Sequence, residues 1–136
     1  MKQFRWPIRV YYEDTDAGGV VYYANYLKFM ERARTEWLRD LGYEQDMLMD
    51  QGVIFVVRRV GIDYIQPARF NQMLEVLTTV TATGPASVTF KQQVMHESNI
   101  LAEAVVKLAC LDVGKFRPHK MPDSLFKEIK RYINVS

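Results

Sequence analysis

Residues 11–26, YYEDTDAGGVVYYANY, combine acidic side chains, paired glycines and the start of an amphipathic run. Asp16 lies just ahead of Gly18 and Gly19, and the amphipathic run begins at about Ala24. A carboxylate can attack an electrophilic carbon or deprotonate water. The first N–H groups of a helix lack intrahelical partners and lie at the positive end of its dipole, so they can hold a developing oxyanion. The segment therefore indicates hydrolytic chemistry where a loop meets a helix.

The same residues also have a purely structural interpretation. Aspartate and glycine are common in turns, so Asp16 could be a turn residue or a charge at a helix start. The glycine pair Gly18-Gly19 allows close approach of substrate to backbone, or it serves a tight loop with unusual φ angles. Glu13 and Asp14 could raise the pKa of Asp16 by repulsion, but we expect their side chains to face solvent. Spacing alone does not separate these alternatives.

The elements around the loop follow from hydrophobic periodicity. Alternation from Phe4 to about Tyr12 predicts a strand before the loop. From about Ala24 to Leu41 the apolar spacing of three or four predicts a helix, with Asn25 as a possible N-cap and Gly42 just beyond its end. Its expected core positions include Tyr26, Phe29, Met30, Ala33, Trp37 and Leu41.

The rest of the chain predicts mainly strands. They span 53–65, 73–83, 88–96 and 100–110, with short helices at 44–51 and after Pro122. In the first of these strands we expect one face to carry Ile54, Val56, Arg58, Val60, Ile62 and Tyr64. In the second, the apolar face should carry Leu74, Val76, Val80 and Ala82.

Tight turns between the last three strands predict an antiparallel meander. The fold class is therefore α+β: an antiparallel sheet of about five strands wrapped around one long helix, in a single domain over residues 1–136. Such a sheet leaves an exposed edge, which pairing with a second copy of the chain would protect.

Composition excludes several functional classes. Lys and Arg total 18 against 16 acidic residues, a net charge of +2 that is too balanced for a typical nucleic-acid binder. No apolar run approaches the roughly 20 residues of a transmembrane helix, and no signal-peptide pattern is apparent. The single cysteine, Cys110, cannot form an internal disulfide and is expected in the core. We therefore expect a cytoplasmic protein.

The run VYYEDTDAGGVVYYANYLKFMERARTEWLR, together with FVVRRVGIDYIQPAR, resembles the hotdog-fold acyl-CoA thioesterases. The resemblance covers nearly the whole chain and is strongest to the YbgC-type branch related to 4-hydroxybenzoyl-CoA thioesterase. It implies a hotdog dimer, often paired into a tetramer, with active sites at the dimer interface. It also implies short-chain or small aromatic acyl-CoA substrates and an association with the bacterial Tol–Pal system. Acyl carrier protein is a possible further partner.

The resemblance assigns roles to individual residues. It implies that Asp16 is catalytic, as nucleophile or as general base, and that the backbone N–H of Tyr23 binds the thioester oxygen. It places Tyr12 beside the catalytic aspartate, and Gly18 and Gly19 at the substrate. Many YbgC-type sequences carry histidine where this chain has Tyr23, so a histidine side chain can have no role at this position.

Two other functions remain open at this level. A hotdog dehydratase would need a histidine near its acid, and His96 and His119 lie far from Asp16 in the sequence. A non-catalytic protein that binds acyl chains or an acyl carrier protein is the second alternative. No phosphate-loop, dinucleotide or paired-ligand motif is present, so we expect neither a metal nor a bound cofactor, and coenzyme A would enter only as part of the substrate.

Overall fold

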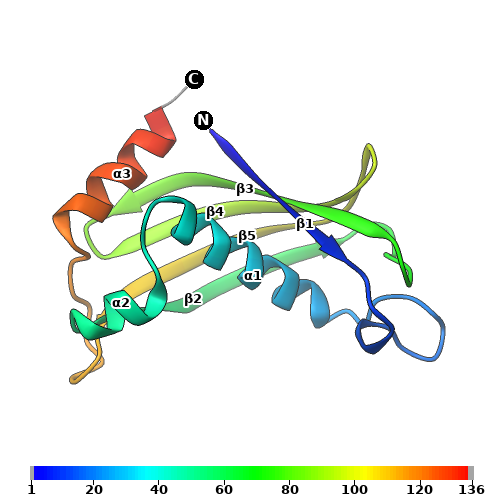
Figure 1. Cartoon of the computed structure of the whole chain (residues 1–136), viewed down its shortest axis with the longest axis horizontal. Helices are drawn as coiled ribbons and strands as arrows, with labels where there is room; N and C mark the ends of the chain where they lie inside the picture. The colour runs from blue at the N-terminus through cyan, green and yellow to red at the C-terminus, as the bar shows by residue number, and fades with distance from the viewer. Residues whose placement is uncertain (1, 135–136) are drawn as a thin grey trace.

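A five-stranded antiparallel sheet forms the body of the molecule (Figure 1). This computed structural model describes residues 2–134. The strands lie in the order β1-β3-β4-β5-β2, so β1 and β2 are the two edges. Their bounds are Gln3–Arg9 for β1, Val53–Tyr64 for β2, Met73–Gly84 for β3, Ser87–His96 for β4 and Asn99–Asp112 for β5. The predicted meander is confirmed in β3, β4 and β5, which pair consecutively.

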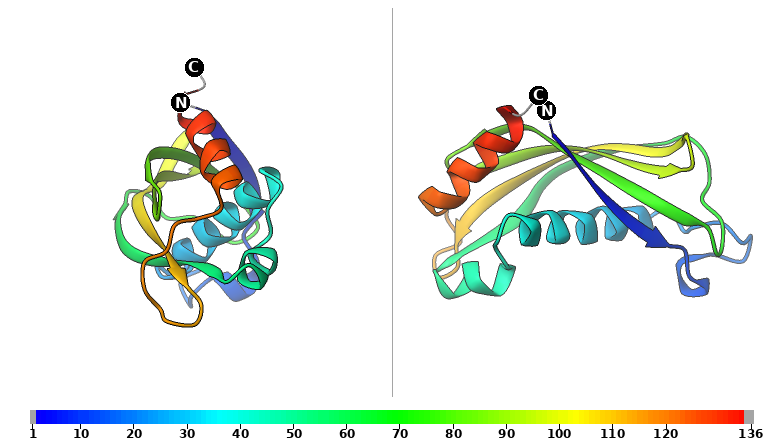
Figure 2. Two further views of the ribbon diagram at one scale, coloured as in Figure 1. Left: turned by 90° about the vertical axis from the view of Figure 1, so that its left-hand side faces the viewer. Right: turned by 45° about the horizontal axis from the view of Figure 1, so that its top comes forward.

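Helix α1, Asn25–Asp40, lies along the concave face of the sheet (Figure 2). Its apolar stripe is buried against the strands, as the periodicity predicted: Tyr26, Phe29, Met30, Ala33 and Trp37. The helix ends in a Schellman arrangement, in which Gly42 N–H donates to Arg39 O at 2.9 Å and Tyr43 N–H donates to Leu38 O at 3.1 Å. Gly42 has a φ of 93°, which explains why glycine follows the helix.

Two shorter helices close one end of the molecule. Helix α2, Gln45–Asp50, connects α1 to β2, and α3, Asp123–Asn134, packs against β3 beside the start of β1 (Figure 2). The buried face of α3 consists of Leu125, Ile129 and Tyr132. The loop before α1 lies at the opposite end. None of the helices in the described part of the chain is long and apolar enough to cross a membrane.

The predicted faces of two strands are partly wrong because both strands contain bulges. Arg58 has no partner in the β2–β5 register, which shifts between Val57 and Arg59. One extra residue turns the following side chains to the other face. Residues Val53, Phe55 and Val57, rather than Ile54 and Val56, therefore share the inward face with Val60, Ile62 and Tyr64. A second bulge, between Val80 and Ala82, moves Ala82 to an exposed position.

Candidate active site

The loop ahead of α1 is a small hydrogen-bonded hairpin. Asp16 N–H donates to Val20 O at 2.9 Å, Gly19 N–H donates to Asp16 O at 3.0 Å, and Thr15 and Val21 form an antiparallel bridge. Gly19 has a φ of 78°, a backbone conformation that favours glycine. Asp16 therefore lies at the tip of an ordered turn, and its position is fixed through the backbone.

One carbonyl group ties this hairpin to the helix. Asp14 O accepts hydrogen bonds from Tyr22 N–H at 3.0 Å and from the Asn25 side-chain amide at 2.9 Å. Asn25 was expected to be the N-cap, but that prediction is wrong: it is the first residue of α1, and Ala24 precedes the helix. The side-chain Nδ2 of Asn25 donates to Asp14 O, so this side chain does not cap the helix N–H groups. These two hydrogen bonds link the base of the hairpin to the first turn of α1.

The side chain of Asp14 is buried, with 8% of its surface exposed, so the expectation that it faces solvent is wrong. Its carboxylate accepts a hydrogen bond from Tyr11 N–H at 2.9 Å. The same local bonding ends the first strand at Arg9 rather than Tyr12, because residues Tyr12–Asp14 turn as a 3-10 helix. Glu13 is exposed, as predicted.

Asp16 itself is exposed at the hairpin tip. Its Oδ1 atom accepts a hydrogen bond from Gly18 N–H at 2.9 Å, and no other hydrogen bond to this carboxylate comes from residues 2–134. A Cβ at Gly18 would lie 3.3 Å from Asp16 Oδ1, so glycine gives the carboxylate its space. One carboxylate oxygen remains available for chemistry.

Tyr23 lies two residues before the start of α1, and its backbone N–H is unpaired within residues 2–134. No acceptor for this N–H occurs among the described residues, although Tyr23 O accepts a hydrogen bond from the Tyr64 hydroxyl at 3.0 Å. The first turn of α1 contains no acidic residue, so nothing there offsets the positive end of the helix dipole. Among the described residues, this N–H is therefore free to donate to a ligand.

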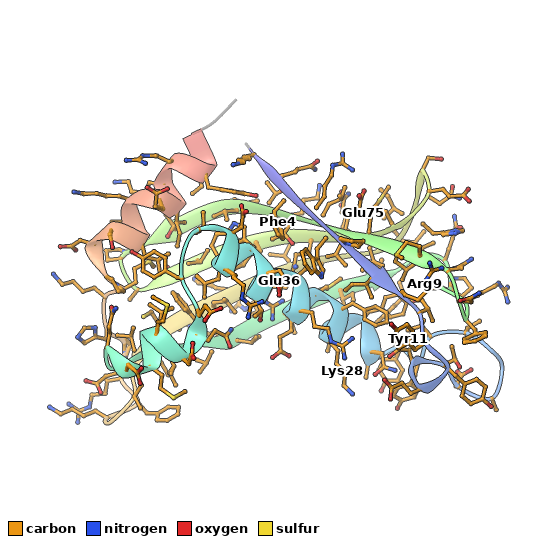
Figure 3. The ribbon with its side chains drawn as sticks, viewed as in Figure 1. Phe4, Arg9, Tyr11, Lys28, Glu36 and Glu75 are labelled. Carbon is orange, nitrogen blue, oxygen red and sulfur yellow. The ribbon has the colours of Figure 1, made fainter. Side chains whose placement is uncertain are left out.

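Exposed aromatic rings surround the hairpin. Tyr12 is 81% exposed and meets Phe70 edge-to-face at 6.0 Å, while Tyr23 packs against Tyr22 at 4.9 Å and Tyr64 at 6.1 Å. Tyr11 lies where β1 meets the hairpin (Figure 3). Sequence reasoning missed Tyr64 and Phe70, which come from segments more than 35 residues further along the chain. Such an apolar surface on an isolated chain is typical of a binding face.

A cavity of about 310 Å³ lies between α1 and the sheet. Its lining is mostly apolar, and the polar side chains in it are Glu31, Arg34 and Gln45. The apolar lining consists of Trp37, Leu38, Phe55, Val56, Val57, Val88, Phe90 and Leu108. Neither Asp16 nor Tyr23 lines it. The cavity touches β2 at residues 55–57, whereas the hairpin contacts Tyr64, about 20 Å further along the strand. The hairpin and the cavity are thus separate within one chain.

The described part of the chain shows no ready site for a metal ion. Within residues 2–134, no three His, Cys, Asp or Glu side chains are grouped closely enough to coordinate one. His96 and His119 lie outside the hairpin, the latter bonded through Nδ1 to Lys120 O at 2.7 Å. The candidate site therefore consists of the polar groups of the hairpin.

One long helix enclosed by a five-stranded antiparallel sheet, with an acidic glycine hairpin at the helix start, defines a hotdog-fold protein. Residues 10–129 match the family model of the thioesterase-like superfamily, and the chain belongs to this superfamily.

Relatives support this assignment in sequence and in structure. The chain is 48% identical over 129 residues to the acyl-CoA thioester hydrolase YbgC of Escherichia coli O6:H1, covering 94% of this chain and 96% of that protein. A probable thioesterase from Bartonella henselae has a TM-score of 0.83 and 34% identity, covering 88% of this chain and 99% of that one. A DHNA-CoA thioesterase from Staphylococcus aureus shares the fold, with a TM-score of 0.89 at 22% identity and coverage of 96% and 93%.

Proposed function

We propose that this protein hydrolyses acyl-CoA thioesters to a free acid and coenzyme A. The observation that carries the proposal is the unpaired Tyr23 N–H at the start of α1, joined through one short hairpin to the exposed carboxylate of Asp16. The names of relatives at 48% identity support the same reaction. As the resemblance implies, we propose short-chain or small aromatic acyl groups, with Tyr12, Gly18 and Gly19 at the substrate.

The proposed reaction places the thioester oxygen on Tyr23 N–H. In one branch, a carboxylate oxygen of Asp16 bonds to the acyl carbon, the C–S bond breaks, and water then hydrolyses the mixed anhydride. In the other, Asp16 takes a proton from water, the water oxygen attacks the acyl carbon, and the thiolate leaves. In both, negative charge develops on the carbonyl oxygen, where the free N–H group stabilises it.

We further propose that the active unit is a homodimer formed through the β2 edge. Three inward-facing residues of β2 are partly uncovered in one chain: Val57 at 49%, Val60 at 38% and Tyr64 at 45% exposure. An edge strand also presents unpaired backbone groups that a second copy can satisfy. Dimers of this kind can pair again into a tetramer.

Antiparallel pairing of two β2 strands would also join the two halves of the site. The Tyr64 end of one copy would lie beside the Phe55–Val57 end of the other. Because Tyr64 holds the hairpin through Tyr23 O, the hairpin of one copy would approach the cavity of the other. The acyl group would then extend from Asp16 into a cavity supplied by the second chain.

A panel of acyl-CoAs, with released thiol measured by a chromogenic reagent, tests the function. We expect Asp16→Asn to lower turnover by about 10²- to 10⁴-fold. Glu13→Gln is the matched control, since Glu13 is an exposed acid three residues away. An Asp16→Asn protein that folds normally and keeps full turnover would refute the assignment. Single turnover in ¹⁸O-labelled water identifies the nucleophilic branch if the product acid carries an unlabelled aspartate oxygen, which requires water to attack the aspartyl carbonyl of the anhydride; the general-base branch always labels the product acid.

The cellular setting is a separate proposal. One buried cysteine, Cys110, without a disulfide partner fits a reducing compartment, so we propose the cytoplasm. The family resemblance supports an association with the Tol–Pal system, and we propose acyl carrier protein as a further partner. Affinity capture with acyl carrier protein and with Tol–Pal components as separate baits tests these two partners.

A further inference from the structure

Arg34 places a positive charge in the otherwise mainly apolar cavity. It projects from α1 among lining residues such as Trp37, Phe55 and Phe90, and it is half-buried. Its Nη1 donates a hydrogen bond of 2.9 Å to Oε1 of Gln92, which is fully buried. This contact fixes the guanidinium from the side of the sheet.

Most of the hydrogen-bonding capacity of this guanidinium is unused. A guanidinium carries five N–H donors, and the Gln92 contact is the one side-chain hydrogen bond that Arg34 makes within residues 2–134. In that part of the chain, no carboxylate forms an ion pair with Arg34. Burial lowers the pKa of Arg34, and the charge of Glu31 opposes this shift. Glu31 is exposed, so solvent screens its charge more strongly than that of Arg34.

Charged groups that leave water are normally paired, and arginine pairs with carboxylates through two parallel hydrogen bonds. We propose that this cavity binds acyl groups that end in a carboxylate, with Arg34 as the residue that recognises the terminal group. The inference rests on the proposed acyl-CoA hydrolysis. The apolar walls suit a short methylene chain, and the volume of about 310 Å³ is at the small end of ligand pockets.

Gln92 is a positioning residue in this arrangement. Its Nε2 donates to Met30 O at 3.0 Å and to Thr78 Oγ1 at 2.9 Å, so its amide is held by both α1 and β3. The remaining oxygen must then point at Arg34. The guanidinium is consequently oriented before any ligand enters, which lowers the entropy cost of binding.

Matched substrates of equal length test the inference directly. Succinyl-, glutaryl- and adipyl-CoA are compared with butyryl-, pentanoyl- and hexanoyl-CoA, which lack the terminal carboxylate. We expect the carboxylate-ended member of at least one pair to have the higher kcat/KM. Arg34→Met keeps the apolar stem and should lower kcat/KM for that substrate by about 10- to 100-fold, with little change for its neutral counterpart. Arg34→Lys should lose part of the preference for the carboxylate. Lysine keeps the charge but lacks the planar guanidinium that makes two parallel hydrogen bonds.

The control variant is Arg32→Met, which removes an exposed arginine from the same helix and should affect both members of a pair equally. A wild-type enzyme that prefers the neutral acyl group at every length would overturn the inference. So would an Arg34→Met protein that loses both activities together and dissociates, because Arg34 would then serve the contact between copies.

A binding measurement keeps this test independent of the reaction. If no acyl-CoA is hydrolysed, the proposed function fails, but thermal shifts with free glutarate and adipate still report on the cavity. Stabilisation of the wild type and of Arg32→Met, but not of Arg34→Met, would support carboxylate binding at Arg34. Equal shifts in all three proteins, or none, would contradict it.

Discussion

The buried amide of Gln92 offers a quantitative test of how α1 is attached to the sheet. Gln92 makes three hydrogen bonds: two as donor, to Met30 O and Thr78 Oγ1, and one as acceptor, from Arg34 Nη1. Each neutral bond contributes about 1 kcal/mol, and a bond to a charged group contributes about 1.5–3 kcal/mol. Because Arg34 is only half-buried, the lower value applies to it.

We expect Gln92→Leu to lower the free energy of unfolding by about 3 kcal/mol. Leucine fills a similar volume and gains some apolar burial, which offsets less than about 1 kcal/mol of the lost bonding. The Thr78 hydroxyl would also stay buried without its present partner. For a chain of this size, the loss corresponds to a fall in Tm of roughly 10 °C.

The assay is urea and thermal unfolding at one fixed protein concentration, because dimerisation makes Tm depend on concentration. Gln93→Leu is the matched control: Gln93 is the adjacent residue of β4, and it bonds Glu103 at 2.9 Å on the other face of the sheet. The control should change stability by less than about 1 kcal/mol. Equal stability of Gln92→Leu and the wild type would show that the network contributes no net stabilisation, and the reasoning would fail.

Three further positions test packing, backbone conformation and titration. The Tyr132 hydroxyl is buried with no hydrogen-bond partner among residues 2–134, so Tyr132→Phe should leave stability unchanged or raise it by up to about 1 kcal/mol in urea unfolding; a clear loss would contradict this. Gly42→Ala should cost about 1–2 kcal/mol in thermal melts because of its positive φ, whereas Gly114→Ala should cost less; equal costs would refute the backbone argument. Burial raises the pKa of the Cys110 thiol from 9.0 to about 11, so its contribution to stability is present below pH 9.0 and lost as pH rises towards 11. Alkylation at about pH 8 should therefore be slow in the native protein and fast after unfolding, and rapid native labelling would exclude a buried thiol.

The central helix was predictable because several local signals agree. A 3.6-residue apolar period places Phe29, Ala33 and Trp37 on one buried face, and Gly42 supplies the positive φ that ends the helix. The predicted bounds differ from the observed ones by one residue at each end. An antiparallel sheet wrapped around a helix followed from one such helix among long alternating strands, whereas the hotdog assignment came from the family resemblance.

The bulge in β2 could not be predicted, because nothing in the sequence marks it. Val53–Val60 is rich in β-branched residues on both sides of Arg58. The odd-numbered and the even-numbered residues therefore both appear to form an apolar face. Only pairing with β5 shows that Arg58 is the extra residue. Phe55 and Val57, which line the cavity from β2, were consequently assigned to the wrong face.

The hairpin was predicted in outline but not in its bonding. Asp16, Gly18 and Gly19 form the expected turn, whereas Asp14 and Asn25 have other roles than those predicted. A buried aspartate cannot be distinguished from a solvated one by composition, because its burial depends on capture by the Tyr11 N–H group. Arg34 was missed for a different reason: its partner Gln92 is 58 residues away, and that contact exists only after the sheet has formed.

The sequence specifies the structures at the two ends of β2 in different ways. At the Tyr64 end, a contiguous motif builds the hairpin through local bonds, such as Asn25 to Asp14, and the segment before β3 holds it in place through the bond from Val21 N–H to Ala68 O. At the Val57 end, the cavity is assembled from α1, α2, β2, β4 and β5, and its half-buried Arg34 is oriented by a distant amide. The hairpin can therefore stay constant while the cavity changes through scattered substitutions. It follows that a sequence motif of this kind identifies the reaction more securely than the acyl group, and that acyl preference has to be argued from the packed structure.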